Sequence, residues 1–231
     1  MLPTYEEFKI RADAVRSRIA AACALARRDP ATVELLAVTK SHPTGAVDLA
    51  ARYGLRAVGE NRVQEGAAKR AQSTAAISWE LIGHLQSNKA RLAVGHFDRI
   101  QSADSGRLLD ILDRVAGEAG KTQAVLLQVN AGLDPAKSGA GPADAERLLV
   151  GALAKANLRV DGLMTIAPLS DDPDVARRSF ASLRELRDRL AAATGARLPE
   201  LSMGMSGDLE AAVAEGSTIV RVGTALFGPR E

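Results

Sequence analysis

The sequence predicts a (β/α)₈ TIM barrel, a closed ring of eight parallel strands enclosed by helices, with one extra helix before it. Short apolar runs alternate with segments of helical periodicity along the whole chain. Eight such runs follow one another at spacings of roughly 20–35 residues, as in βα units with right-handed crossovers. No Pro/Gly/Ser-rich linker divides the 231 residues. We therefore predict a single domain over residues 1–231.

Each element is predicted from its own pattern. A charged helix opens the chain at about residues 4–27, and Asp29-Pro30 ends it. The apolar runs predict strands at 35–39, 57–59, 79–83, 99–101, 124–129, 158–166, 200–205 and 218–222. The clearest helical segments are 45–54, 107–120, 143–157 and 174–195. A helix is expected after every strand except the last. Strand order cannot be read from sequence, so a doubly wound open sheet is the alternative.

The composition excludes several classes of protein. Apolar residues make up 46% and charged residues 25%, as in an ordinary soluble globular protein. A net charge of +2 and 3% aromatic residues give neither the basic surface nor the stacking side chains of a nucleic-acid-binding protein. The N-terminus is charged throughout, and no run approaches the ~18 apolar residues of a membrane span. We expect a cytoplasmic protein that contacts neither nucleic acid nor membrane.

Metal chemistry is not predicted either. The only cysteine, Cys23, lies in an alanine-rich helical stretch and is expected to be buried. His42, His84 and His96 fall on different elements without the spacing of metal ligands. His42 is close to Lys40 in sequence, and the other two are expected in loops or on the surface.

Lys40 is the first candidate for function. It follows the apolar run of the first strand, and active groups of such barrels lie where strands end. Only seven of the chain's 30 basic residues are lysines. A partly buried amine can lose its proton and attack a carbonyl, whereas a guanidinium stays protonated. The alternative is a surface lysine at a strand terminus.

A phosphate site is predicted after the seventh and eighth strands, where barrels often bind phosphate. Ser206 and Gly207 precede a helix expected to run to Gly216, and Ser206 is a good N-cap whose neighbouring amides would attract an anion. Gly223 lets the backbone approach a ligand, and Thr224 offers a hydroxyl. The alternative is an ordinary capped helix, which Asp208 favours because its charge would complement the helix end.

Together, a strand-end amine and a phosphate cradle in one barrel suggest an aldehyde that carries a phosphate. A Schiff base to pyridoxal 5′-phosphate (PLP) would use both ends of this site. Met203 and Met205 flank the phosphate candidate and are expected mainly to pack, although we include Met203 among the residues near the cofactor.

Seven segments resemble one known family in sequence and order. They are LLAVTKSHP, VGENRVQE, WELIGHLQSNKAR, IQSADS, LLQVNAGLDPAKSG, GLMTIAP and LSMGMSGDLEAAVAEGSTIVRVGTALFG. The chain resembles the pyridoxal phosphate homeostasis proteins, which are related to the barrel domain of alanine racemase. The resemblance covers about residues 5–230.

The resemblance implies roles for particular residues. Lys40 would form the Schiff base with PLP, Asn61 would lie near its ring, and Arg221 would face its pyridine nitrogen. The phosphate would lie at Ser206, Gly207, Gly223 and Thr224. Gln86, Asn88 and Lys89 belong to the family's LQSNK signature at the rim, and Lys137 is the one candidate contact in a variable segment.

The resemblance also bears on activity. An arginine at the ring nitrogen keeps that nitrogen unprotonated and weakens the ring as an electron sink, although alanine racemase tolerates this. The racemase takes a second acid/base tyrosine from the partner subunit of a dimer formed through a further β-domain. This chain ends just after the eighth strand, and neither Tyr5 nor Tyr53 is expected over the cofactor. We therefore expect a monomer.

Three classes of function follow from these expectations. The first is a non-enzymatic protein that buffers PLP or delivers it to apo-enzymes in intracellular PLP homeostasis, with no catalytic residues. The second is a PLP-dependent amino-acid racemase or lyase, which would need another acid/base group near Lys40. A purely structural or partner-binding barrel is the third.

Overall fold

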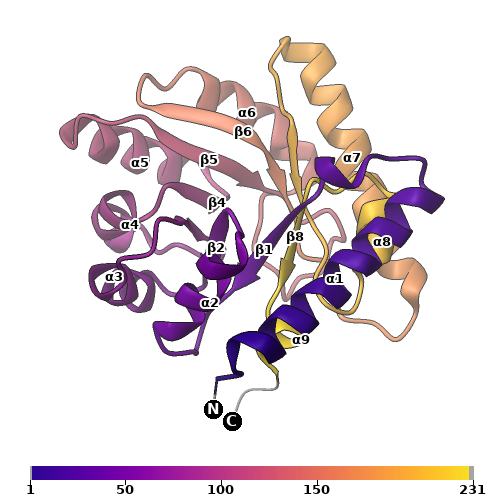
Figure 1. The fold of residues 1–231 in the computed structure, drawn as a ribbon. Helices are drawn as coiled ribbons and strands as arrows, with labels where there is room; N and C mark the ends of the chain where they lie inside the picture. The colour runs from indigo at the N-terminus through magenta and orange to yellow at the C-terminus, as the bar shows by residue number, and fades with distance from the viewer. Residues whose placement is uncertain (1, 229–231) are drawn as a thin grey trace.

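The computed structural model describes residues 2–228 and contains a closed barrel of eight parallel strands in chain order (Figure 1). The strands are β1 (Glu34–Val38), β2 (Ala57–Glu60), β3 (Ser78–Leu81), β4 (Arg99–Ala103), β5 (Gln123–Gln128), β6 (Leu158–Met164), β7 (Glu200–Ser202) and β8 (Ile219–Val222). β8 closes the ring by pairing with β1, with Leu36 opposite Arg221. The predicted (β/α)₈ barrel is confirmed, and an open sheet is excluded.

Helices connect the strands and cover the barrel. They are α1 (Tyr5–Leu25), α2 (Gly45–Tyr53), α3 (Val63–Gln72), α4 (Ala90–His96), α5 (Gly106–Glu118), α6 (Ala145–Leu153), α7 (Pro173–Thr194), α8 (Leu209–Ala214) and α9 (Thr224–Phe227), with single 3₁₀ turns at Pro30–Thr32, Ser87–Lys89 and Pro142–Asp144. The prediction that no helix follows the last strand was wrong, because α9 follows β8. Its four residues are too few to show helical periodicity in a sequence. No helix within residues 2–228 is both long and apolar enough to cross a membrane.

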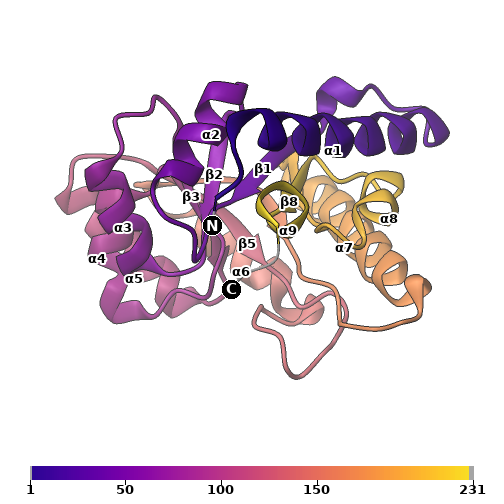
Figure 2. The ribbon, with the colours of Figure 1, turned by 60° about the horizontal axis from the view of Figure 1, so that its bottom comes forward.

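The extra helix α1 begins at a capping box. Thr4 accepts a hydrogen bond from the Glu7 amide at 3.3 Å, and the Glu7 carboxylate accepts one from the Thr4 amide at 2.8 Å. A stripe that includes Phe8, Val15 and Ile19 is buried. α1 lies across α8 and α9, beside the place where β8 meets β1 (Figures 1 and 2).

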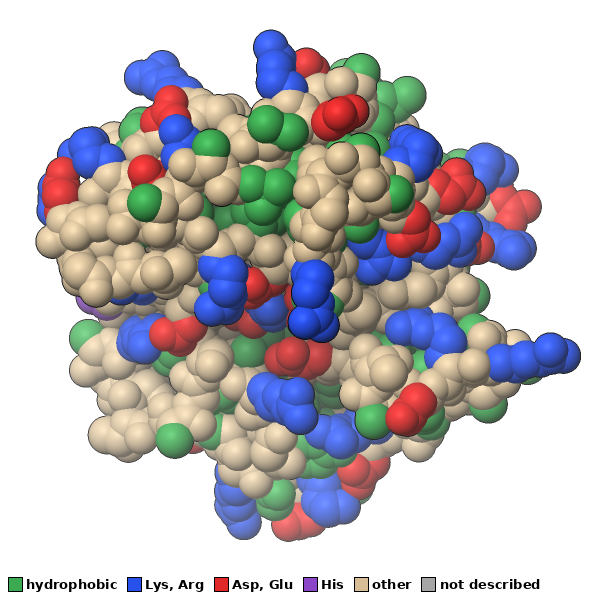
Figure 3. Space-filling view, turned by 90° about the horizontal axis from the view of Figure 1, so that it is seen from above, with side chains coloured by type: hydrophobic (Ala, Val, Ile, Leu, Met, Phe, Trp, Pro, Cys, Tyr) green, Lys and Arg blue, Asp and Glu red, His purple; other side chains and the backbone are tan. Residues whose placement is uncertain are grey.

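The inside of the barrel is apolar in one part and polar in another. Leu36, Val38, Ala57, Ile82, Leu126, Met164 and Ile219 form a cluster separate from the larger core that includes the helices. The same interior holds buried polar side chains, described below. Figure 3 looks onto the face where the strands begin, and there positive and negative side chains lie side by side around the middle. Active groups of such barrels lie at the opposite face, where the strands end.

Candidate functional site

A cavity of about 400 Å³ lies at the face where the strands end, the face that is brought forward in Figure 2. Seven of the eight residues predicted to bind the cofactor line this cavity: Lys40, Asn61, Ser206, Gly207, Arg221, Gly223 and Thr224. They come from segments up to 184 positions apart in the sequence, between 40 and 224. Parallel strands end at one rim of a closed barrel, and this brings the seven residues together.

Met203 is not among the residues that line the cavity. Its side chain is fully buried in the larger hydrophobic core, whereas Met205 is 41% exposed and does line the cavity. Met203 therefore packs, as was mainly expected for both methionines, and the cavity lining gives no support for including it near the cofactor. Met205 is the methionine next to the site.

Lys40 and Asn61 leave neighbouring strands. Lys40 follows β1 after Thr39 and is partly exposed within the cavity. Ser41, the next residue, has a φ of 62°, which is uncommon for a residue other than glycine. Asn61 directly follows β2, and its carbonyl oxygen would lie 2.2 Å from a Cβ at position 83. Only glycine fits there, so Gly83 permits the close approach of these two loops.

Arg221 lies inside the barrel and is 4% exposed. One guanidinium nitrogen donates to the Ser202 hydroxyl and another to the Thr165 carbonyl, both at 2.8 Å. Burial lowers the pKa of Arg221 to about 10, although nearby Asp208 acts in the opposite direction. Arg221 is therefore still a cation near neutral pH.

The Ser202 hydroxyl continues this polar chain. It donates to Gln101 at 2.6 Å, and the Gln101 amide donates to Glu80. Glu80 in turn accepts two hydrogen bonds from Arg99, at 2.6 and 3.0 Å. A column of side-chain hydrogen bonds thus joins the cavity to the opposite end of the barrel. The apolar pattern used to predict the strands contained no signal for it.

The phosphate candidate is built differently from the prediction. Ser206 is not an N-cap, because α8 begins only at Leu209 and Asp208 occupies the cap position. Asp208 instead accepts a hydrogen bond from the Met205 amide at 2.5 Å and closes the turn 205–208. The predicted extension of this helix to Gly216 was also wrong, since α8 ends at Ala214. A short polar residue can close a turn or cap a helix, and the sequence does not distinguish the two.

The backbone of this region is still suited to an anion. Among the backbone hydrogen bonds of the described residues, none is donated by the amides of Ser206, Gly207, Gly223 or Thr224. A Cβ on Gly223 would lie 3.2 Å from the Val38 carbonyl, so the two strand ends approach closely there. These amides and the two hydroxyls form a set of hydrogen-bond donors on one side of the cavity.

Helix α1 supports this set of donors from outside. Arg18 donates to the Ser206 carbonyl at 3.0 Å and makes two hydrogen bonds to Glu210, at 2.6 and 2.9 Å. Two parallel hydrogen bonds between arginine and a carboxylate fix the geometry of both groups. The extra helix therefore holds the loop that carries Ser206.

Several lining residues were not predicted as contacts. His84 is an exposed loop residue, as expected, and it also lines the cavity, with its Nδ1 3.4 Å from Asp104. Gln128 also lines it, and its amide donates to the Ser138 carbonyl at 2.8 Å. Lys137, a possible contact in the sequence reading, does line the cavity. The signal for His84 was its place directly after the third apolar run.

The other rim candidates lie elsewhere. Gln86, Asn88 and Lys89 are not among the residues that line the cavity. His42 stacks on Phe227, with ring centroids 5.0 Å apart. The Tyr53 hydroxyl donates to Asp13 at 2.6 Å, while Arg52 lies 3.7 Å from the Tyr5 ring centroid. Neither tyrosine lines the cavity.

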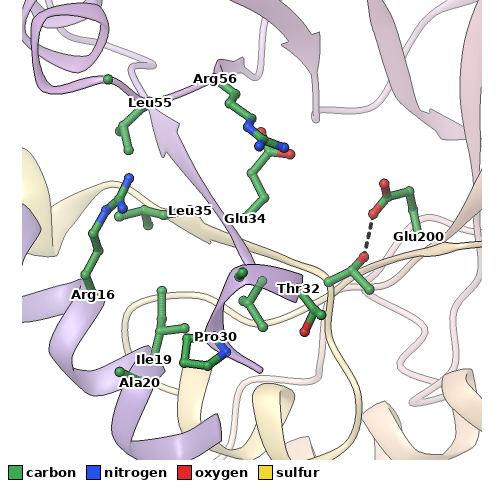
Figure 4. Close-up of a pocket in the computed structure, with 14 residues that line it drawn as sticks. Arg16, Ile19, Ala20, Pro30, Thr32, Glu34, Leu35, Leu55, Arg56 and Glu200 are labelled. Atoms are coloured by element: carbon green, nitrogen blue, oxygen red, sulfur yellow. Dashed lines mark hydrogen bonds between the residues drawn. The ribbon is translucent and has the colours of Figure 1, made fainter. Parts of the chain in front are cut away.

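A larger cavity of about 700 Å³ opens between α1 and the start of β1 (Figure 4). The figure shows Arg56 and Glu34 pointing toward one another, and Glu200 accepts a hydrogen bond from Thr218 at 2.5 Å. Burial raises the pKa of Glu34, and the charge of Glu80 adds to this effect. No lysine lines this cavity, and the strands begin here rather than end, so it is not the site the sequence predicts.

Comparisons with known proteins agree with the fold. Residues 10–231 match the family profile of the alanine racemase N-terminal domain. A pyridoxal phosphate homeostasis protein of Aquifex aeolicus is 40% identical over 222 residues, which are 96% of this chain and 97% of the relative.

Solved structures of other proteins have the same fold. PipY of Synechococcus elongatus, solved with PLP bound, is 45% identical, with a TM-score of 0.82 over 93% of this chain and 100% of that one. Alanine racemase of Clostridium difficile shares the fold, with 14% identity and a TM-score of 0.73 over 84% of this chain and 52% of the racemase. Fold and site thus define a barrel of the alanine racemase N-terminal type. Within that class, the chain belongs to the family of the pyridoxal phosphate homeostasis proteins.

Proposed function

We propose that this protein binds PLP as a Schiff base on Lys40 and buffers or delivers the cofactor inside the cell without efficient turnover. The observation that carries the proposal is that one cavity is lined by the Lys40 amine, by residues whose amides donate no backbone hydrogen bond among the described residues, and by the buried Arg221. The names of its relatives and the PLP bound to PipY support the same conclusion.

The residues present fit the chemical groups of PLP. A volume of about 400 Å³ is within the range of small-molecule sites. The amides of Ser206, Gly207, Gly223 and Thr224 would hold the phosphate, with the Ser206 and Thr224 hydroxyls beside them. Asn61 would lie near the ring. When bound, PLP supplies an aldehyde carbon with which a lysine amine can combine reversibly.

Arg221 would face the ring nitrogen. Since Ser202 and Thr165 fix its guanidinium and it remains a cation near neutral pH, it can donate a hydrogen bond to an unprotonated nitrogen but cannot accept one. An unprotonated ring withdraws electrons less strongly, which favours holding the cofactor over using it.

The arrangement of acidic and basic side chains also favours binding of PLP without catalysis. A racemase needs proton transfer on both faces of the substrate carbon, and Lys40 can serve only one. Neither tyrosine is available for this role. The Tyr53 hydroxyl donates to Asp13, and the Tyr5 ring lies beneath the Arg52 guanidinium. His84 also lines the cavity, and it is the side chain through which the enzymatic alternative can be tested. We propose PLP-dependent apo-enzymes as the recipients of the cofactor.

Borohydride reduction of the PLP-loaded protein should attach one pyridoxyl group, on Lys40. Reduction converts a Schiff base into a stable amine, and mass spectrometry of the peptides locates it. Lys40→Ala should lose the Schiff-base absorbance but keep the fold, because its side chain contributes little to the core. Label that persists on Lys40→Ala would contradict the assignment, with Lys137, which lines the same cavity, examined first.

Ser206→Ala and Thr224→Ala should each weaken PLP binding selectively. Losing one hydrogen bond to a charged group costs about 1.5–3 kcal/mol, which corresponds to about 10- to 150-fold in affinity. Pyridoxal, which has no phosphate, serves as the control and should bind equally to all three proteins. If Thr224→Ala weakened pyridoxal as much as PLP, the phosphate would have to bind elsewhere.

The loaded protein should not racemise amino acids efficiently. General acid–base catalysis usually contributes about 10²–10⁴-fold, and neither Tyr5 nor Tyr53 lines the cavity to supply the second of the two required groups. The assay is incubation with D- and L-amino acids followed by chiral chromatography. Turnover near the typical enzyme value of ~10 s⁻¹ would favour the racemase instead. The variant His84→Asn would then show whether His84 supplies the second group.

A further inference from the structure

A second lysine lies close to Lys40 in the fold but outside the cavity. Lys69, on α3, is 7% exposed and is the only lysine among the buried residues of the described chain. Burying an ammonium group is costly unless it is paired and hydrogen-bonded. Lys69 has three acceptors, each 2.8 Å from Nζ: the Thr39 carbonyl and one carboxylate oxygen each of Glu60 and Glu65. Its three N–H donors are thereby all used.

Lys69 is linked to the peptide groups on both sides of Lys40, directly to the one before it and through Glu65 to the one after it. The Thr39 carbonyl, bonded directly to Lys69, belongs to the peptide that precedes Lys40. The amide of Ser41, in the peptide that follows, donates to the same Glu65 oxygen at 2.5 Å. Lys40 is therefore held between two fixed peptide groups, although Lys69 does not itself line the cavity.

The backbone conformation of Ser41 shows why these peptide groups need to be held by hydrogen bonds. A φ of 62° is unfavourable for serine and persists only where neighbouring groups hold it. The Ser41 amide is held by Glu65, and Glu65 is held by Lys69. Without this link the turn could relax, and the direction in which Lys40 leaves β1 would change.

The same cluster joins two strand ends. The Thr39 hydroxyl, after β1, donates at 2.6 Å to the Glu60 oxygen that accepts from Lys69. Glu60 ends β2 and directly precedes Asn61. Lys69 thus fixes the backbone next to both Lys40 and Asn61, two of the residues that line the cavity.

We propose that Lys69 is a positioning residue for Lys40, acting through Glu65, Thr39 and Glu60. This inference rests on the proposed function. In Schiff-base formation the Lys40 nitrogen would add to the aldehyde carbon of PLP, its two protons would pass to the carbonyl oxygen, and that oxygen would leave as one water as the C=N bond forms. Lys69 takes no part in these steps. It sets the angle and distance at which the Lys40 nitrogen meets the aldehyde.

The test compares a ligand that can react with one that cannot. Pyridoxine 5′-phosphate keeps the ring and phosphate of PLP but has an alcohol in place of the aldehyde. Because misplacing a reacting group by about 1 Å can cost about 100-fold in rate, Lys69→Met should slow Schiff-base formation by about 10- to 100-fold. Stopped-flow absorbance measures this rate, and fluorescence titration measures the affinity for pyridoxine 5′-phosphate, which should stay unchanged.

Lys121→Met is the matched control. The Lys121 ammonium also donates to backbone carbonyls, those of Val94 at 2.8 Å and Phe97 at 3.3 Å, but it lies outside the cavity. It should reproduce any general loss of stability while leaving the rate of Schiff-base formation unchanged.

A second pair of variants covers the case in which Lys69→Met does not fold. Glu65 has a side chain that is 24% exposed, so its replacement is milder. Glu65→Ala removes the acceptor of the Ser41 amide and should slow Schiff-base formation, whereas Glu65→Gln keeps an acceptor oxygen and should restore most of the rate.

Two results would contradict the role proposed for Lys69. Equal rates in the unaltered protein and in Glu65→Ala, or a matching loss of affinity for pyridoxine 5′-phosphate, would overturn it while leaving the proposed function in place. If borohydride did not label Lys40 in the unaltered protein, the proposed function would fail as well, and this inference with it.

Discussion

The charge of Arg221, buried inside the barrel, is the constraint on which the site depends. A guanidinium stays protonated near neutral pH, so the interior of the barrel must supply hydrogen-bond acceptors for it. The Thr165 carbonyl and the Ser202 hydroxyl do so, and Gln101 and Glu80 extend the chain toward the end of the barrel where the strands begin. One part of the interior is therefore polar, and the apolar cluster around Leu36 and Met164 fills the rest. A cation held this rigidly presents a fixed hydrogen-bond donor to whatever occupies the cavity.

Two lysines near this cavity have opposite environments, and the difference explains their different roles. Lys40 is partly exposed within the cavity, whereas Lys69 is buried and bonded to three oxygens. The buried lysine can stabilise the backbone but cannot reach a ligand. Burial raises the pKa of Glu60, while the hydrogen bonds from Lys69 and Thr39 oppose that rise. For Glu65, burial acts in the same direction, but hydrogen bonds from Lys69 and the Ser41 amide outweigh it and lower the pKa. Together with Arg18 on α1, which holds the loop at Ser206, such contacts outside the cavity fix the residues inside it.

The barrel and most of the candidate site could be predicted from the sequence because both follow from local patterns. Apolar runs mark strands, and the residues directly after them share one rim, which placed Lys40, Asn61 and Thr224 correctly at one cavity. Features that depend on side-chain direction or on distant partners could not be predicted. Met203 and Met205 are separated only by Gly204, and the sequence gave no indication that Met205 faces the cavity and Met203 the core. Ser206 and Asp208 are both good capping residues, and only the backbone shows that Asp208 closes the turn. Lys69 bonds to Thr39, and Arg221 bonds to Thr165 and Ser202. These partners lie on or directly after other strands, so no short sequence window contains them.

A crystal structure of the protein grown with PLP tests the central claim most directly. The account predicts continuous electron density from Nζ of Lys40 to the cofactor, with the phosphate at the amides of Ser206, Gly207, Gly223 and Thr224 and the ring nitrogen facing Arg221. Density for PLP in the cavity between α1 and β1, or joined to Lys137 rather than Lys40, would contradict it.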